Sequence, residues 1–322
     1  MSWNQVVGQH DEIAMRRVHV SRIASDGPIQ ARRDLTITYN PPMGTPRVSI
    51  CIPTYNYAHY IGEALRSACD QTYRDIEIIV IDDASTDGTV AVVEAIARNE
   101  SRVRLTRNPR NLGLQANYNR CIELANAPLV KILCADDLLT PDCVERMVCV
   151  LDAYPEVSLV TCGREFVGAD REHRRVERYA RQVVIEPGQQ TLRRCFYLGN
   201  LIGEPTAVMF RRSRAGAGFN ENYKQILDLE LWLRIVADNW FAALPEALCQ
   251  FRQHQDRATF KQMDTGLIAA DRVRLFHEYH LHPALRGASV VERLIWDARM
   301  AWVLGREPST RSEEHTSELQ SH

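Results

Sequence analysis

Short apolar runs that end in polar residues are the feature that most constrains the fold of this chain. The runs at 48–52 (VSICI), 76–81 (IEIIVI) and 129–133 (LVKIL) are rich in β-branched residues and nearly all apolar. Such runs are typical of strands that are buried on both faces of a parallel sheet. Helical patterns at 61–69 and 89–98 lie between them, and this alternation indicates βαβ units. We therefore expect an α/β protein with a mostly parallel sheet flanked by helices.

Polar residues follow each run at the point where it ends. Pro53-Thr54-Tyr55-Asn56 follows the first run, Asp82-Asp83 the second, and Cys134-Ala135-Asp136-Asp137 the third. In open α/β sheets, ligands bind beyond the carboxyl ends of the strands. We therefore expect these groups at one edge of the sheet. They suit a ligand with a nucleobase at one end and a metal-bound diphosphate at the other.

The composition narrows the class of protein. The 322 residues are 45% hydrophobic and 25% charged, with a formal net charge of −2, which is typical of a globular protein and gives no electrostatic reason for nucleic-acid binding. No apolar stretch is long enough for a membrane span, and the first thirty residues lack a signal-peptide pattern. The nine cysteines show no C-x-x-C pair or zinc-type spacing, as expected for reduced thiols. These features predict a cytoplasmic protein.

Changes in pattern divide the chain. Residues 1–46 are weakly patterned and are expected to be an N-terminal extension or linker, whereas 47–256 carry the strand–helix alternation and 257–310 are helical. Within the second segment, the arginine-rich residues 164–182 are expected to form a solvated excursion. Residues 311–322 (RSEEHTSELQSH) resemble the translation of a widely used sequencing adapter, so we expect the natural C-terminus to be missing and exclude them from fold reasoning.

Two patterns in the C-terminal third bear on the architecture and on partners. Residues 241–251 are predicted to form a strand pair. Residues 289–304 form a helical pattern with one apolar stripe. The stripe suits packing on the domain, which is favoured, or contact with a membrane surface, which would give a peripheral association at the inner face of the membrane.

Five motifs together resemble the family 2 glycosyltransferases. They are VSICIPTYN (48–56), IDDASTD (81–87), NLG (111–113), ADD (135–137) and DLELWLR (228–234). Each motif is weak alone, but five in order and spacing are strong. The resemblance implies a GT-A (Rossmann-like) fold over roughly residues 47–256 and an inverting transfer. The donor would be a nucleotide sugar, with uridine diphosphate sugars favoured, and the acceptor a hydroxyl of a glycan or lipid-linked molecule in surface polysaccharide synthesis.

The resemblance assigns the nucleoside end of the donor to Pro53, Tyr55 and Asp82. An aromatic ring supplies flat apolar area beside a base, proline rigidifies the turn, and a carboxylate can accept the ring N–H of uracil. The structural alternatives are a plain βα turn with a buried tyrosine, and helix capping by the acids of the second motif. Ser85 and Asp87 are assigned mostly to that structural role.

The acidic pair Asp136 and Asp137 corresponds to the metal motif of the family, with Asp136 expected to bind Mn²⁺ or Mg²⁺ and Asp137 to support it. These hard cations take few carboxylates and neutralise charge on a departing diphosphate. Many family members have a further acid where this chain has Cys134, and a thiol is a poor ligand for these ions. His254, in an R-x-H motif, is a candidate for the metal or the diphosphate, although a lone histidine is as often structural.

Asp228 is the candidate catalytic base. Displacement at the anomeric carbon needs a carboxylate that takes the acceptor proton as the new bond forms. The usual Glu-Asp pair of the family is Leu227-Asp228 here, and Glu230 would point differently on a helix. The alternative is an N-cap for the following helix. Arg234 is expected to be structural, and Glu204-Pro205-Thr206 is a candidate acceptor contact.

Two other functions remain open on the sequence. A sugar nucleotidyltransferase shares the α/β layout, but it would need a glycine-rich phosphate loop after the first strand, where this chain has Pro53-Thr54-Tyr55-Asn56. A non-catalytic module that binds sugar nucleotides or glycans gains support from Cys134 and Leu227, which replace acids. Retention of Asp82, Asp136 and Asp228 together argues against that module.

Overall fold

The computed structural model describes residues 44–168, 174–254, 265–286, 289–290, 292–294 and 296. The expected N-terminal extension up to residue 43, and the expected tail at 311–322, lie outside the described residues, as does most of the apolar stripe at 289–304. Within the described part of the chain, no helix has the length and apolarity needed to cross a bilayer.

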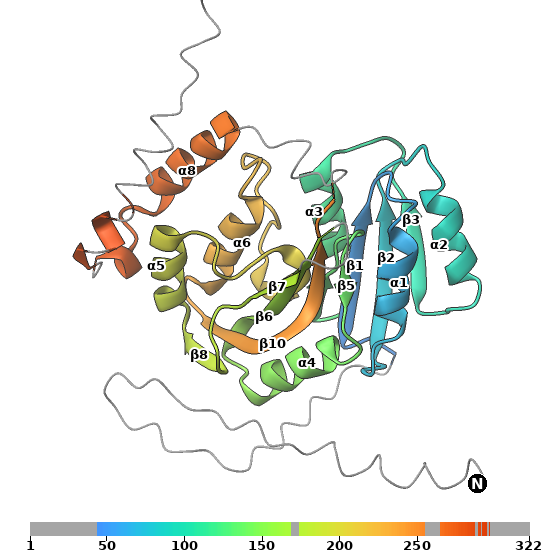
Figure 1. Ribbon diagram of the computed structural model, residues 1–322, viewed down its shortest axis with the longest axis horizontal. Coiled ribbons are helices and arrows are strands. Elements are labelled where there is room, and N and C mark those ends of the chain that lie inside the picture. Colours follow the sequence, from blue (N-terminus) through green and yellow to red (C-terminus); the bar gives the residue numbers. More distant parts are fainter. Residues whose placement is uncertain are drawn as a thin grey trace, which may run out of the picture.

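One ten-stranded sheet forms the centre of the molecule (Figure 1). The strands are β1 (Val48–Thr54), β2 (Ile76–Asp82), β3 (Val103–Arg107), β4 (Leu129–Ile132), β5 (Leu138–Leu139), β6 (Val157–Val167), β7 (Arg174–Glu177), β8 (Val184–Pro187), β9 (Val208–Arg211) and β10 (Trp240–Arg252). The main path runs β3-β2-β1-β4-β9-β6-β10-β5, with β7 beside β6 and β8 beside β10. The three longest ladders, β10–β6, β1–β2 and β2–β3, are parallel, and antiparallel pairs enter with β5, β7, β8 and β9. The expected α/β fold with a mostly parallel sheet is confirmed.

Helices cover both faces of this sheet. They are α1 (Ile61–Cys69), α2 (Thr89–Ala97), α3 (Leu114–Leu124), α4 (Cys143–Ala153), α5 (Gly188–Leu198), α6 (Leu227–Val236) and α8 (Thr265–Tyr279). The first apolar cluster lies under α1, α2 and α4 and the second under α3, α5, α6 and α8. Ile50 and Ile52 of β1 face the first cluster and Cys51 faces the second, because successive side chains of a strand point to opposite faces.

The expected strand pair at 241–251 is a single long strand, β10, so that prediction was wrong. β10 runs beside β6 with a register shift between Ala243 and Ala247. Gly163 of β6 fits against this irregular stretch because a Cβ there would lie 2.9 Å from the carbonyl oxygen of Glu246. The shift interrupts the alternation of side chains, which in sequence is indistinguishable from a break between two strands.

The arginine-rich segment 164–182 was predicted to be a solvated excursion, and this prediction was wrong for its first part. Arg164 lies buried within β6, and β7 pairs with β6 as an antiparallel neighbour. Opposite charges face each other in this pair, with Arg174 Nη1 lying 3.2 Å from Glu165 Oε2. Strands whose partners are matched by charge need no apolar periodicity, so the pattern gave no sign of them.

Candidate active site

Three buried polar atoms line the edge where β1, β2 and β3 end. The register places Thr54 beside Asp82, and Asp82 beside Arg107. Thr54 Oγ1, Asp82 Oδ1 and Asn108 Oδ1 have no hydrogen-bond partner among the described residues. The other oxygen of Asp82 accepts from the Ser85 backbone N–H at 3.1 Å and lies 3.4 Å from the Arg107 guanidinium. An unpaired buried polar atom costs about 1–3 kcal/mol, so this row is typical of a surface that a polar ligand completes.

The turn after β1 is fixed by the loop after β2. Asn56, which has a left-handed φ of 57°, accepts a hydrogen bond from a backbone N–H of that loop, and its own N–H donates to Ser85 Oγ at 2.9 Å. Asp87 accepts from the N-terminal backbone of α2 and from the first loop. Asp87 therefore caps α2, as the structural alternative expected, whereas Ser85 holds the first loop against the second. Pro53 is buried inside β1, and Tyr55 is 42% exposed, so the Tyr55 ring is open to a ligand.

Asp83 differs from Asp82 because both of its oxygens are occupied. Oδ1 accepts from the N–H of Leu112 at 2.9 Å, and Oδ2 accepts from the N–H of Gly113 at 3.0 Å. Gly113 has a φ of 89°, a conformation that favours glycine. The motif at 111–113 is therefore a turn that Asp83 holds against the end of β2.

Asp136 and Asp137 lie buried in the loop between β4 and β5, close to Cys134. One possible ligand atom from each of the three lies within 4.8 Å of the others. Asp137 accepts from the Thr206 hydroxyl at 2.7 Å and from the Arg252 backbone N–H at 3.2 Å, so it helps to fix the loop. Burial, with the two aspartates nearby, raises the pKa of the Cys134 thiol to about 12. A protonated thiol is not a ligand for a hard cation.

His254 lies against Asp136, as its candidacy for the metal site requires. Its Nε2 is 3.1 Å from Asp136 Oδ2, and its ring stacks on Tyr60 with centroids 4.1 Å apart. Neighbouring ligands of an octahedral ion at about 2.1 Å are about 3.0 Å from each other. This nitrogen and oxygen form a hydrogen bond here, and their spacing is also compatible with two ligands of one divalent cation. Arg252 links the acidic loop to α1, because its guanidinium donates to the Asp136 carbonyl and pairs with Glu63 at 2.6 Å.

Asp228 lies in the first turn of α6 and is partly exposed. Its Oδ1 accepts from the Leu229 backbone N–H at 2.8 Å, and its Oδ2 accepts from the Asn200 side-chain amide at 3.0 Å. Burial raises the pKa of Asp228 to about 7, the Leu229 hydrogen bond works against this rise, and the charge of Glu204 adds to it. A carboxyl group that titrates near neutral pH can take a proton from a hydroxyl group.

The neighbouring charges on α6 have structural partners. Glu230 is buried and pairs with Arg234 at 2.9 Å, one helical turn away. Arg234 also donates to the carbonyl of Ala215 at 2.9 Å. Glu230 thus lies apart from the contacts of Asp228, and Arg234 has the structural role expected for it.

The loop between α5 and β9 is packed tightly beside Asp228. The N–H of Gly203 donates to Asn200 Oδ1 at 2.9 Å, and the indole N–H of Trp232 donates to the Gly203 carbonyl at 2.9 Å. Gly203 has a φ of 111°, and a Cβ there would lie 2.6 Å from Arg164 Nη1. Arg164 forms an ion pair with Glu204 at 2.6 Å. This backbone conformation and this close approach favour glycine at 203. The Arg164–Glu204 ion pair adjoins Gly203, which in turn binds Asn200, the hydrogen-bond partner of Asp228.

Thr206 joins this loop to the acidic motif. Its hydroxyl donates to Asp137, as described above, and accepts from the Cys134 backbone N–H at 3.0 Å. A continuous path of chain and hydrogen bonds therefore runs from Asp137 through Thr206 to the Asn200–Asp228 pair. The acidic loop and the first turn of α6 are thus both bonded to the loop that connects α5 and β9.

Sequence reasoning missed several members of this site. Asn108 and Asn200 belong to no recognised motif, and Arg164 was placed in a solvated excursion. Glu204 and Thr206 were noticed only as candidate acceptor contacts. Their roles depend on partners far away in the sequence, and periodicity carries no signal of such pairs.

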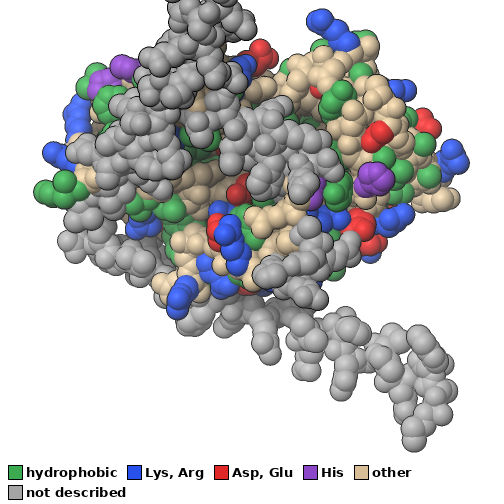
Figure 2. Space-filling model, turned by 45° about the horizontal axis from the view of Figure 1, so that its top comes forward, with side chains coloured by type: hydrophobic (Ala, Val, Ile, Leu, Met, Phe, Trp, Pro, Cys, Tyr) green, Lys and Arg blue, Asp and Glu red, His purple; other side chains and the backbone are tan. Residues whose placement is uncertain are grey.

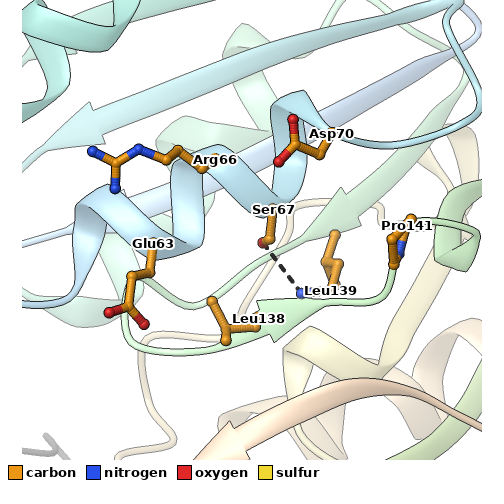
Figure 3. A pocket seen from close by; sticks show the side chains of 7 residues that line it. All are labelled: Glu63, Arg66, Ser67, Asp70, Leu138, Leu139 and Pro141. Carbon is orange, nitrogen blue, oxygen red and sulfur yellow. Dashed lines mark hydrogen bonds between the residues drawn. The ribbon is translucent and has the colours of Figure 1, made fainter.

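An open pocket of about 320 Å³ lies between α1 and β5 (Figure 3). It is lined by Glu63, Arg66, Ser67, Asp70, Leu138, Leu139 and Pro141. The Ser67 hydroxyl accepts there from the Leu139 N–H at 3.2 Å. None of the predicted site residues lines it. On the face in Figure 2, basic and acidic side chains of the described residues are interspersed, in line with the formal net charge of −2.

Comparison with known proteins finds chains of similar sequence. Uncharacterized protein MT1568 of Mycobacterium tuberculosis is 31% identical over 260 residues, which cover 74% of this chain and 76% of that protein. Chondroitin synthase of Pasteurella multocida is 27% identical, and the match covers 68% of this chain but only 22% of the synthase.

Solved structures with this fold include two nucleotide complexes. TarS 1-349 of S. aureus in complex with UDP has a TM-score of 0.56 at 19% identity, covering 86% of this chain and 75% of that one. Mannosyltransferase PcManGT from Pyrobaculum calidifontis, in complex with GDP-Man and Mn²⁺, has a TM-score of 0.50 at 21% identity, covering 82% and 73%. At these identities the likeness concerns the fold, which is the expected GT-A fold. The family described as Glycosyl transferase family 2 matches residues 49–217, more than half of the chain, and the chain therefore belongs to that family.

Proposed function

We propose that this glycosyltransferase moves a sugar from a uridine diphosphate sugar to a hydroxyl of a glycan or lipid-linked acceptor, with inversion, in surface polysaccharide synthesis. The expected setting is the cytoplasm, at the inner face of the membrane. The observation that carries the proposal is the path from Asp137 through Thr206 to the Asn200–Asp228 pair. It joins a candidate diphosphate site to a candidate base. The match to chondroitin synthase supports a role in polysaccharide synthesis.

The nucleoside is proposed to lie beyond the ends of β1 and β2. The exposed Tyr55 ring would lie beside the base, Pro53 would hold the turn, and Asp82 Oδ1, which lacks a partner among the described residues, would accept the ring N–H. A carboxylate paired with a ring N–H makes a charge-assisted hydrogen bond, which is stronger than a neutral one. The bound UDP of the TarS structure, on the same fold, supports a uridine nucleotide.

Mn²⁺ or Mg²⁺ is proposed to bind Asp136 and His254, with Asp137 and Thr206 fixing the loop. When bound, the ion would neutralise charge on the diphosphate leaving group. The spacing of 3.1 Å between Asp136 Oδ2 and His254 Nε2 supports this assignment, as does the Mn²⁺ in the mannosyltransferase of the same fold.

Asp228 is proposed as the general base. It would take the proton of the acceptor hydroxyl while that oxygen attacks the anomeric carbon, on the side opposite to the departing diphosphate. The bond between the anomeric carbon and the diphosphate oxygen breaks as the new glycosidic bond forms, which inverts the configuration. A pKa of about 7 suits this role, since the group is partly ionised at neutral pH and still basic enough to accept a proton.

A non-catalytic binding module is the second candidate, and Cys134 supports it. The family resemblance implies an acid at this position in many members, and the buried, protonated thiol of Cys134 would leave the metal site one oxygen short. A module of this kind would bind nucleotide but release no product. The sugar nucleotidyltransferase alternative is set aside by membership of glycosyl transferase family 2.

The test is release of UDP from a panel of UDP-sugars, with and without Mn²⁺, together with UDP binding. Asp136→Asn should weaken metal-dependent binding, and Asp228→Asn should abolish release while it leaves binding intact. The controls are Asp142→Asn and Asp238→Asn. They change exposed acids, one shortly after the loop that carries Asp136 and the other just after α6, which carries Asp228. Binding without release in every combination of donor and acceptor would favour the module, and the absence of nucleotide binding would refute the proposal.

A further inference from the structure

Helix α8 contacts the segment that leads into α6. It lies beyond the residues 49–217 that match the family and beyond the expected catalytic segment 47–256. Asp271 of α8 is only 3% exposed. Its Oδ2 accepts hydrogen bonds from three successive backbone N–H groups, those of Lys224 at 2.8 Å, Gln225 at 2.6 Å and Ile226 at 3.3 Å.

These three N–H groups lie at the start of the helix that carries Asp228. Ile226 is the residue at the N-cap of α6, and no side-chain cap is present there. The first N–H groups of a helix have no partner within it, and a carboxylate near them is favourable both as an acceptor and against the helix dipole. Asp271 supplies that carboxylate from a different helix, and Asp228 follows the N-cap by two residues.

The rest of α8 is also anchored at this place. Leu275, one turn after Asp271, is 2% exposed within the apolar cluster shared with α6. The Tyr223 hydroxyl donates to Glu278 at 2.8 Å, and Arg274 donates to the carbonyl of Asn222. The part of α8 that follows Asp271 is therefore anchored by packing and by hydrogen bonds.

We propose that Asp271 is a positioning residue for Asp228. Because it binds the backbone of 224–226, it determines where α6 begins, and hence where the Asp228 carboxyl group lies relative to its partner Asn200. The inference rests on the proposed role of Asp228 as base. It makes α8 a part of the catalytic unit, whereas the sequence suggested a separate helical segment.

The kinetic test compares Asp271→Ala with Asp271→Asn and Glu278→Gln. The alanine variant loses the acceptor, and displacement of a reacting group by about 1 Å can cost up to about 100-fold in rate. We expect kcat to fall at least tenfold with KM for the UDP-sugar within about twofold, because the donor residues lie on other elements. The Asn variant keeps an acceptor oxygen and should restore kcat to within about threefold. Glu278→Gln removes the charge of a different anchor of α8 but keeps an acceptor oxygen for the Tyr223 hydroxyl, so it should leave kcat unchanged. An equal loss in the Ala and Gln variants, or an intact kcat in the Ala variant, would overturn the proposal.

Backbone hydrogen exchange separates this inference from the proposed function. In Asp271→Ala, amides 224–226 and the Leu229 amide, which donates to Asp228, should exchange at least about tenfold faster than in wild type. In Glu278→Gln they should not change. If the wild type releases no UDP from any donor, the proposed function fails, and the Leu229 amide alone then decides the inference. Faster exchange at Leu229 in the Ala variant supports positioning, and unchanged exchange overturns it.

Discussion

Replacement of Asp228 by asparagine should abolish transfer and, above pH 7, make the protein more stable. Burial raises the pKa of Asp228 from 3.8 to about 7. At about 1.4 kcal/mol per pH unit, ionisation of this group in the folded protein costs at most about 4 kcal/mol of folding free energy, because solvent screens part of the effect at this partly exposed side chain. Asparagine carries no charge but loses the hydrogen bond from the Asn200 amide, which is worth about 1 kcal/mol. The net gain is at most about 3 kcal/mol, or roughly 4–6 °C in Tm for a chain of this length.

The stability that Asp228→Asn gains over the wild type should increase as the pH rises. Below about pH 4, Asp228 is protonated in both the folded and the unfolded chain, so its burial costs the wild type no folding free energy through ionisation. Between about pH 4 and pH 7, the unfolded chain ionises while the folded chain keeps the proton, so the stability of the wild type falls as pH rises. Above pH 7 the difference between the two proteins should stay constant.

Denaturant unfolding of both proteins between pH 4.5 and 8.5 measures this difference. Asp238→Asn, an exposed change just beyond the other end of α6, is the control and should show no trend with pH. A plain N-cap aspartate would have a lowered pKa, so its replacement would be neutral or destabilising at high pH. An Asp228→Asn variant that is no more stable than wild type at pH 8 would refute the reasoning.

Three further changes probe the rest of the site. His254→Ala should raise the Mn²⁺ concentration for half-maximal activity at least about tenfold, whereas His277→Ala, at an exposed position, should not; an unchanged requirement for metal would remove His254 from the site. Thr206→Val should lower the free energy of unfolding by about 2 kcal/mol because Asp137 loses its hydroxyl partner, and Thr206→Ser should restore it; equal stability of Val and wild type in urea would contradict this. Gly203→Ala should lower the free energy of unfolding by more than about 1 kcal/mol and reduce kcat, since φ is 111° at this position. An alanine variant with the Tm of the wild type would contradict the need for glycine there.

Local sequence patterns predicted the parallel half of the sheet and the acids at its edge. The apolar runs of β1, β2 and β4 are buried on both faces, so their composition alone indicates strands. Asp82 is the last residue of β2, and Asp136 lies in the loop after β4. The topology of a parallel sheet brings such strand ends to one edge. The resemblance to the family added Asp228 and His254, which lie far along the chain.

The remainder depends on contacts between distant segments. β8 and α5 lie between the arginine-rich stretch and Asn200 and were not predicted; β8 is only four residues long, whereas α5 buries residues at helical spacing, such as Leu192, Cys195 and Phe196. β10 was divided in two because its register shift imitates a strand break. The carboxylate of Asp271 meets its three backbone donors through tertiary packing of α8. An isolated aspartate in a helical pattern is typical of a solvated charge. Only the fold reveals that Asp271 accepts hydrogen bonds from the backbone before α6.

The candidate site holds several polar groups whose surroundings are costly for the stability of the folded protein. Asp82 Oδ1 and Thr54 Oγ1 lack partners among the described residues, and Asp228 is held near neutrality by burial. Proteins retain such features where a ligand or a reaction offsets the cost. The site should therefore gain stability when a nucleotide is bound, in proportion to the ligand concentration over its Kd.

The most direct test of the central claim is metal-dependent release of UDP from UDP-sugars by the wild type and by Asp228→Asn, with UDP binding measured on the same samples. The account predicts Mn²⁺-dependent release by the wild type, and release at least about 100-fold slower in the variant, with UDP affinity unchanged. Equal release by both proteins would contradict the assignment of Asp228 as the base. The absence of UDP binding by the folded wild type would contradict the account as a whole.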